Sequence, residues 1–299
     1  MKRRPSPVLG SQTVLVFGAS GLLGSTLCPL LRQQGLRVLR QSRSANADLY
    51  CDPCSQVDVQ NVVRAVQPQV IINLVAESNV DRCETEPVRA FEGNVLAARS
   101  IASATLACES RPHMIHISSD QVYSGLGPHS EEKVNPVNIY GLTKLAGELF
   151  ALDAGATVLR TNFYGRSRCA GRLSFTDWLT DSLGDSTPFT VFEDVQFSAL
   201  HLETLAKLIG ETAEKRIPGL YNLGTTDGIS KASFAAKFAE LLGLETSHMR
   251  HGRVTDLRLT ARRPNDMSMD VSRFETAFGT PLPTAANELT RAVKDYGRL

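Results

Sequence analysis

The sequence lacks the marks of membrane, secreted and nucleic-acid-binding proteins. No apolar run approaches the ~20 residues that a membrane-spanning helix needs, and no signal peptide is apparent. Lysine and arginine number 32 against 31 aspartates and glutamates, so the net charge is +1 and no broad basic surface is indicated. We therefore expect a cytoplasmic protein without membrane or nucleic-acid partners.

Cysteine is sparse and shows no pattern of a disulfide framework. The six cysteines are scattered along the chain, so we expect reduced thiols. Cys51 and Cys54 have the spacing of a metal-binding pair, but no second pair and no nearby histidine doublet could complete four zinc ligands. We therefore predict no metal site.

The composition is that of an ordinary globular protein, with 42% hydrophobic and 21% charged residues in 299, enough to bury a substantial core. Residues 1–12 are basic and proline-containing without an apolar core, which predicts a disordered leader. From residue 13 onward, short β-branched runs alternate with helical stripes, which favours an α/β fold with a doubly wound parallel sheet. We expect this Rossmann-type domain over residues 13–165. Residues 166–299 would form mainly a smaller, interleaved lobe, with some segments returning to the sheet.

A glycine turn follows the first apolar run. Residues 13–17 are β-branched and aromatic, Gly18, Gly21 and Gly24 come next, and residues 26–31 carry a helical stripe. Gly18 would allow a tight turn, Gly21 would let the backbone approach phosphates, and Gly24 would let helix and strand pack closely. The spacing G-x-x-G-x-x-G differs from the commoner G-x-G-x-x-G, so a purely structural turn is the alternative to a dinucleotide site.

The end of the second predicted strand, residues 36–39, bears on the choice of coenzyme. An acidic residue there would bind the ribose 2′-hydroxyl of NAD, but Arg40, Ser42 and Arg43 follow instead. These residues favour NADP, although a solvated loop would look similar. Asp52 would either reach the adenine or cap the next helix.

Polar groups are expected to converge where later strands end. The strand at 114–117 leads directly into Ser118 and Ser119, and Tyr140 and Lys144 follow about twenty residues later, four apart on one helix face. An ammonium beside the phenol would lower its pKa and ease proton transfer. Taken separately, each feature also has a purely structural explanation: the serines could belong to a turn, and the tyrosine could be packed beside an exposed lysine.

The preceding strand and helix add further candidates. The strand at 70–76 is followed by a polar loop, 77–87, at the sheet edge where ligands collect. A long helix over 88–107 contains Asn94, which would be either a packing amide or a hydrogen-bonding group in the site.

These motifs resemble the extended short-chain dehydrogenase/reductase superfamily in the glycine turn, Ser119 and the Tyr140-x-x-x-Lys144 pair. Within it, three further segments are similar to the dTDP-4-dehydrorhamnose reductase family: residues 117–123, Leu159-Arg160-Thr161, and residues 261–264 with 270–272 and 278–279. The similarity runs from Thr13 to about Tyr296. Lining up on Val122 and Tyr123 makes Ser119, not Ser118, the catalytic hydroxyl.

The resemblance implies NADPH-dependent reduction of the 4-keto group of a nucleotide-linked 6-deoxy sugar. The implied catalytic residues are Ser119, Tyr140 and Lys144. Residue patterns and resemblance together give the expected coenzyme contacts: Gly18, Ser20, Gly21, Leu22, Leu23, Gly24, Arg40, Ser42, Arg43, Asp52, Val75, Ala76, Asn94, Tyr140 and Lys144. The implied substrate contacts are Ser119, Asp120, Gln121, Phe163 and Arg263.

Two departures leave the sugar open, because Gln121 stands where the family commonly has tyrosine and Phe163 where it commonly has tryptophan. Arg166, Arg168 and Arg172 would clamp a nucleotide diphosphate or lie on a solvated surface. Two other functions remain open: an epimerase or dehydratase with tightly bound NAD, and a regulatory protein like the subunit of methionine adenosyltransferase that resembles the same family. A homodimer is also among the expectations.

Overall fold

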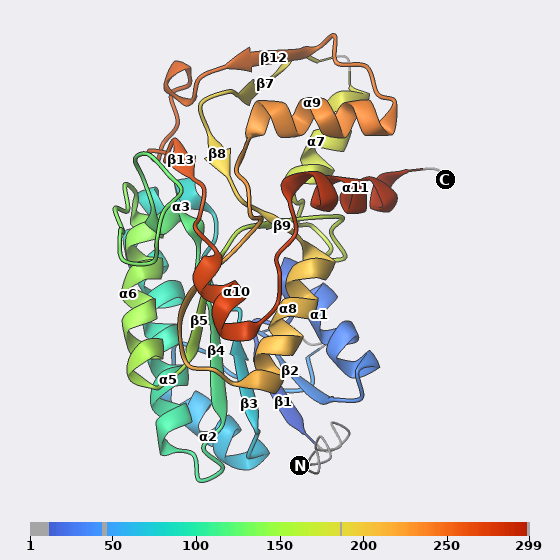
Figure 1. The fold of residues 1–299 in the computed structure, drawn as a ribbon. Coiled ribbons are helices and arrows are strands. Elements are labelled where there is room, and N and C mark those ends of the chain that lie inside the picture. Colours follow the sequence, from blue (N-terminus) through green and yellow to red (C-terminus); the bar gives the residue numbers. More distant parts are fainter. Residues whose placement is uncertain (1–11, 44–46, 186, 298–299) are drawn as a thin grey trace.

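The computed structural model describes residues 12–43, 47–185 and 187–297. The expected leader therefore lies outside the described residues, apart from Gln12. Two lobes lie one above the other, the larger built on a six-stranded sheet and the smaller on short strands and helices (Figure 1). No helix in the described ranges is long and apolar enough to cross a membrane.

The central sheet is parallel throughout and runs in the order β2-β1-β3-β4-β5-β10. Its strands are Thr13–Phe17 (β1), Arg37–Gln41 (β2), Val70–Asn73 (β3), His113–Ile117 (β4), Thr157–Thr161 (β5) and Gly219–Leu223 (β10). Leu49 adds a single parallel bridge to Gln41 beyond β2. The chain thus leaves β1 toward one edge and returns at β3 toward the other, which creates the switch-point crevice where such sheets bind ligands.

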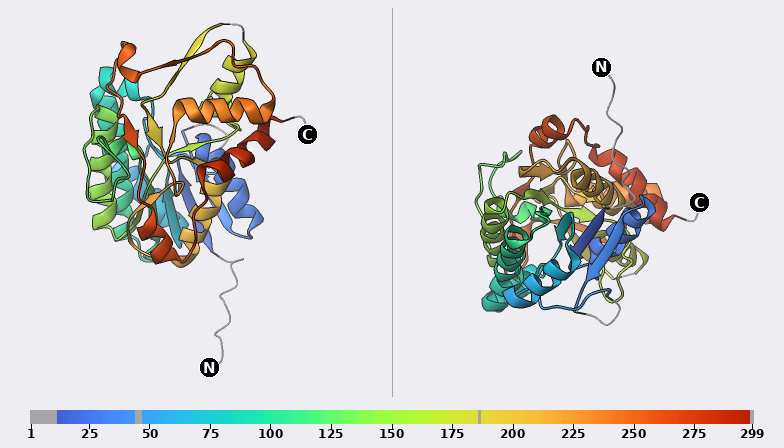
Figure 2. Two further views of the ribbon diagram at one scale, coloured as in Figure 1. Left: turned by 45° about the horizontal axis from the view of Figure 1, so that its top comes forward. Right: turned by 90° about the horizontal axis from the view of Figure 1, so that it is seen from below.

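Helices cover both faces of the sheet, as the view from below shows (Figure 2). One face packs against α1 (Leu22–Gln33), α8 (Leu202–Lys215) and α10 (Ser272–Phe278) through one apolar core cluster. The other face packs against α2 (Gln56–Val66), α5 (Ala97–Ala107) and α6 (Ile139–Asp153) through a second cluster. The strands are apolar on both sides because both faces are buried.

The single helix predicted over 88–107 is interrupted by a π-helical segment. It consists of α4 (Pro87–Phe91), the π segment η2 (Glu92–Leu96) and α5, and a short helix α3 (Val80–Thr85) precedes it. A π segment widens the helix locally and is frequent at functional sites. It places Gly93 and Asn94 beside the loop that follows β3.

The smaller lobe has its own apolar core of aromatic and aliphatic side chains. Its elements are α7 (Phe175–Gly184), β7 (Phe189–Phe192), β8 (Gln196–Phe197), β11 (Ile229–Ser230), α9 (Lys231–Leu242), β12 (Met249–Gly252), η4 (Val254–Asp256), β13 (Asp266–Met267) and α11 (Ala285–Tyr296). The short strands β6 (Phe163–Tyr164) and β9 (Leu200–His201) pair at the junction with the larger lobe. The chain crosses repeatedly between lobes, since α8, β10 and α10 belong to the larger one.

Candidate active site

The glycine turn joins β1 to α1 at the switch point. Gly18 has φ +75°, and a Cβ there would lie 2.9 Å from the Val75 backbone nitrogen. A Cβ at Gly24 would lie 2.4 Å from the Ala19 carbonyl oxygen. Any side chain at these positions would therefore displace backbone. Helix α1 carries no acidic residue in its first turn, so its N-terminus and the bare turn form a cradle suited to an anion.

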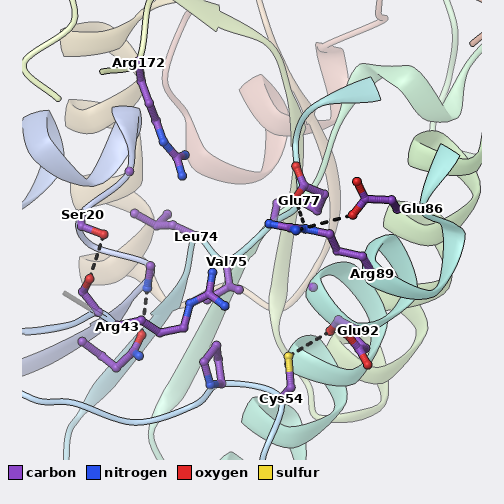
Figure 3. Close-up of a pocket in the computed structure, with 17 residues that line it drawn as sticks. Ser20, Arg43, Cys54, Leu74, Val75, Glu77, Glu86, Arg89, Glu92 and Arg172 are labelled. Atoms are coloured by element: carbon purple, nitrogen blue, oxygen red, sulfur yellow. Dashed lines mark hydrogen bonds and ion pairs between the residues drawn. The ribbon is translucent and has the colours of Figure 1, made fainter. Parts of the chain in front are cut away.

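A cavity of about 740 Å³ opens over this turn (Figure 3). Its walls come from the turn, the end of β2, the loop after β3 and the π segment. The expected coenzyme residues that line it are Gly18, Ser20, Gly21, Ser42, Arg43, Val75 and Ala76. The Ser42 hydroxyl is 2.8 Å from the Ser20 hydroxyl, which ties the end of β2 to the glycine turn.

Arg40 lies outside this cavity. Its guanidinium Nε is 3.1 Å from Asp48, and the hydrogen bond from Arg40 lowers the pKa of that carboxyl to about 2. The sequence pattern placed both arginines at the ribose, but only Arg43 lines the cavity. Arg40 is turned toward Asp48, a partner eight residues along the chain that the strand-end pattern does not reveal.

Asp52 and Asn94 also do not line the cavity. Asp52 accepts a hydrogen bond from the Cys54 backbone (3.0 Å), and Ser55 rather than Asp52 caps helix α2, so the capping alternative was wrong. Asn94 is buried, accepts from the Glu77 backbone N–H at 2.9 Å and donates to the Thr143 hydroxyl at 3.0 Å. It therefore acts as a packing amide that joins the loop after β3 to α6.

A second cavity, of about 640 Å³, adjoins the first and shares the glycine turn, Arg43 and Arg172 with it. Ser119, Tyr140 and Lys144 all line this second cavity, together with Leu22, Leu23, Gly24 and Phe163. The structure thus brings the three predicted catalytic side chains together beside the glycine turn.

The two adjacent serines have different partners. The Ser118 hydroxyl donates to the Glu148 carboxylate, which is buried in a 2.6 Å ion pair with Arg160. The Ser119 hydroxyl instead accepts from the Gln121 backbone N–H at 3.1 Å, which caps the short 3₁₀ helix η3 (Asp120–Val122), and donates a longer hydrogen bond, 3.3 Å, to the Asp120 carboxylate. Both serines line the second cavity, but Ser118 is committed to the buried ion pair, whereas Ser119 bonds only to residues of the short segment that follows it.

Burial controls the protonation of the tyrosine and the lysine. Burial raises the pKa of Tyr140 to about 12, although the Ser119 hydroxyl acts in the opposite direction. Burial lowers the pKa of Lys144 to about 8, against the attraction of Glu148. The Lys144 ammonium donates to the Ile117 carbonyl at 2.7 Å. The expected lowering of the phenol pKa by Lys144 is thus not what the structure shows.

Of the implied substrate contacts other than Ser119, only Phe163 lines the second cavity. Asp120 is buried and accepts from Asn162 at 2.6 Å, and burial raises the pKa of its carboxyl to about 6. Gln121 accepts from Asn138 at 3.1 Å, and Arg263 forms a 2.8 Å ion pair with Asp81. These three side chains are absent from the lining of the second cavity, and each is held by the partner just named.

Other lining residues escaped prediction from the sequence. Asn162 lines the second cavity while holding Asp120, and Arg89 lines both cavities while bonded to Glu77 at 2.9 Å. The polar loop 77–87 indicated the edge of the sheet where a ligand would bind. It did not indicate which of the charged residues there would form ion pairs with each other. Among the described residues, no group of three or more histidines, cysteines, aspartates and glutamates is arranged to hold a metal ion.

Comparisons with known proteins agree with this geometry. The family model described as the RmlD substrate binding domain matches residues 12–298. The "Probable low-salt glycan biosynthesis reductase Agl14" of Haloferax volcanii is 30% identical, over 94% of this chain and 98% of the relative. A dTDP-4-dehydrorhamnose reductase of Streptomyces griseus is 30% identical over 90% and 88%. The methionine adenosyltransferase 2 subunit beta of Mus musculus is 29% identical over 93% and 87%.

The fold has a counterpart among solved structures. A dTDP-4-dehydrorhamnose reductase from Bacillus anthracis, in complex with NADP, matches with a TM-score of 0.85 at 24% identity, over 94% of this chain and 98% of that chain. This likeness confirms the predicted Rossmann-type α/β fold. Because the family model spans nearly the whole sequence, the resemblance seen in the motifs is confirmed as well: the chain belongs to the RmlD substrate-binding domain family.

Proposed function

We propose that this protein reduces the 4-keto group of a nucleotide-linked 6-deoxy sugar with NADPH. The observation that carries the proposal is the convergence of Ser119, Tyr140 and Lys144 on a cavity that adjoins the one over the glycine turn and shares its lining. The names of two relatives support it, since the proteins from Haloferax volcanii and Streptomyces griseus are described as reductases.

The residues at the turn fit a dinucleotide coenzyme and favour NADP(H) over NAD(H). The bare glycine backbone and the N-terminus of α1 would hold the pyrophosphate. Arg43 and the Ser20–Ser42 hydroxyl pair lie at the end of β2, where a 2′-phosphate would bind and where an acidic residue would select NAD. When bound, the nicotinamide supplies a hydride for the keto carbon.

The catalytic roles follow from the protonation states. With a pKa near 12, Tyr140 is a protonated phenol at neutral pH and can donate its proton to the alkoxide that develops on the sugar oxygen. The Ser119 hydroxyl, oriented by the Gln121 backbone, can donate to the same oxygen. Lys144 would bind the nicotinamide ribose with the donors left after its bond to Ile117.

The sugar would lie beside Phe163, whose half-buried ring lines the second cavity. An apolar ring at this place suits the apolar face and methyl group of a 6-deoxy sugar. Asp120, Gln121 and Arg263 would contact the sugar nucleotide only after leaving the partners that hold them, so we assign them a role at the border of the substrate site.

A regulatory role is the second candidate, because a relative of similar identity is the methionine adenosyltransferase 2 subunit beta. The reductase and the regulatory hypotheses both assume that a coenzyme binds in these cavities. They differ in whether Ser119, Tyr140 and Lys144 catalyse a reaction on a substrate. Stable association with a larger enzyme, without reductase activity on any sugar nucleotide, would favour regulation. A copurifying NAD without net NADPH consumption would instead favour an epimerase or dehydratase.

The deciding experiment follows NADPH oxidation at 340 nm, the absorbance band of reduced nicotinamide, with dTDP-4-keto-6-deoxy sugars and with NADH in parallel. Turnover faster with NADPH than with NADH supports both parts of the proposal. Coenzyme binding without turnover would move the assignment to the regulatory or epimerase reading.

We also propose a homodimer and a cytoplasmic location. Helix α6 exposes Leu142 (52%), Leu149 (65%) and Phe150 (37%), more apolar surface than a solvated helix needs. Sedimentation at several concentrations tests the dimer. The six cysteines are all free thiols, which suits a reducing compartment.

A further inference from the structure

The loop between β6 and α7 brings an arginine of the smaller lobe over the glycine turn. Of the three arginines in this loop, Arg166 donates to the Asp295 carbonyl at 2.9 Å and Arg168 lies 3.3 Å from Glu203. Arg172 is the one arginine of this loop that lines both cavities. In Figure 3 its side chain extends from the loop toward the cavity, on the side of Ser20.

The loop is attached to the glycine turn itself. The Cys169 thiol donates to the Ser20 carbonyl at 3.0 Å, and the Arg172 backbone N–H donates to the Cys169 carbonyl at 3.2 Å. The Arg172 Nη1 lies 3.9 Å from the point where a Cβ on Gly21 would be. The guanidinium therefore faces the backbone that a pyrophosphate would approach.

The charges around the cavity single out the same side chain. Arg89 also lines the cavity, but it is paired with Glu77 and Glu86. Arg172 forms no ion pair with any residue in the described ranges, and the first turn of α1 beside it has no acidic side chain. A cation and a helix N-terminus thus face one space with no carboxylate paired to either, since the glutamates that line the cavity, Glu77, Glu86 and Glu92, lie on its other side (Figure 3).

We infer that Arg172 binds the pyrophosphate of the dinucleotide coenzyme from the side opposite the glycine turn. This inference rests on the coenzyme binding proposed above and adds a contact from the smaller lobe. Coenzyme binding would then hold the loop 165–174 against the larger lobe. The competing occupant is the diphosphate of the sugar nucleotide, because Arg172 also lines the second cavity, where the sugar would lie.

Fluorescence titration with NADPH and with NADH tests the inference without turnover. Arg172→Gln is expected to raise the Kd of both coenzymes about 10- to 100-fold and by a similar factor, because both contain the pyrophosphate. Arg172→Lys should recover part of the affinity, since a cation remains. Arg43→Gln should weaken NADPH far more than NADH, because only NADPH carries the 2′-phosphate.

Arg168→Gln is the matched control, since it removes a cation from the same loop on the side of Glu203 and should leave both Kd values unchanged. Thermal unfolding of each variant checks that the fold is kept. Unchanged coenzyme affinity in Arg172→Gln would overturn the inference. A titration with dTDP in which this variant loses affinity for dTDP alone would also overturn it, because the arginine would then bind the substrate. A wild-type chain that binds coenzyme but reduces no sugar nucleotide would refute the reductase proposal alone.

Discussion

Tyr140 and Lys144 show how a motif specifies geometry without specifying protonation. Their spacing placed them on one helix face, as expected, but burial moves their pKa values apart, the phenol up to about 12 and the ammonium down to about 8. Desolvation disfavours the charged form of each group. A motif cannot report it, because the depth of burial depends on residues throughout the fold.

Replacing Tyr140 with phenylalanine should lower kcat by about 10²–10⁴-fold, the usual contribution of a general acid. NADPH affinity should stay nearly unchanged, since the ring is kept and only the hydroxyl is lost. Stopped-flow turnover and fluorescence titration measure the two quantities. Tyr50→Phe, at an exposed position, is the control. Ordinary turnover by Tyr140→Phe would remove the tyrosine from the mechanism.

The pH profile should be set by Lys144 on its alkaline side. As the pH rises through about 8, Lys144 loses its proton, whereas the Tyr140 phenol stays protonated to about 12. If the ammonium is needed, kcat/KM for reduction falls about tenfold per pH unit above 8. In Lys144→Arg the cation persists and the decline should move to higher pH. A flat profile to pH 10 in the wild type would contradict the assignment.

At the scale of elements, the pattern of apolar residues was sufficient to predict the bounds of a strand whose residues are all buried. The first strand was predicted at its observed bounds, 13–17, and the strand predicted at 114–117 begins only one residue earlier, at His113. The π segment within the predicted helix 88–107 was missed, since it depends on how Asn94 contacts the loop after β3 and helix α6. Those contacts join residues far apart in sequence, and no local pattern encodes them.

The same limit explains which site residues were found. The glycine turn and Ser119 follow strands, and Tyr140 and Lys144 share a helix face, so the relative positions of these groups follow from secondary structure. Arg40 and Arg263 were expected at ligands but pair with Asp48 and Asp81, partners supplied by neighbouring loops. Loop conformation decided these cases, and the sequence alone does not determine it.

Helix α6 carries Tyr140 and Lys144 and packs closely on the π segment. A Cβ at Gly147 would lie 2.4 Å from the Asn94 carbonyl oxygen, so Gly147→Ala must push the two helices apart. We expect a loss of about 1–3 kcal/mol in unfolding free energy, with reduced kcat as Tyr140 and Lys144 shift. Urea unfolding and steady-state kinetics measure both effects.

The matched variant is Gly184→Ala in α7, where a Cβ would meet nothing within 4 Å. It should be neutral or slightly stabilising, because alanine is the better helix former. Equal behaviour of the two alanine variants would show that α6 adjusts freely against the π segment.

At the scale of the whole molecule, segments after residue 165 complete the larger lobe. Helix α8 places Leu205 and Ile209 in the same core cluster as Leu27 and Leu31 of α1. Strand β10 covers the edge of β5, and its Asn222 accepts a 2.6 Å hydrogen bond from the buried Tyr123 hydroxyl. The larger lobe therefore depends on residues from the C-terminal half of the chain.

A chain truncated after residue 165 should consequently fail to fold, although it contains the glycine turn and the whole triad. Loss of α8 would expose Leu27 and Leu31, and loss of β10 would leave the Tyr123 hydroxyl without its acceptor, together a cost of about 4–9 kcal/mol, comparable to the ~5–15 kcal/mol that stabilises a typical domain. The full chain should unfold in one cooperative transition, monitored by circular dichroism, because both lobes share these segments. The truncated chain should show no transition and bind no NADPH. A cooperative melt and coenzyme binding by the truncated chain would show instead that residues 13–165 fold independently.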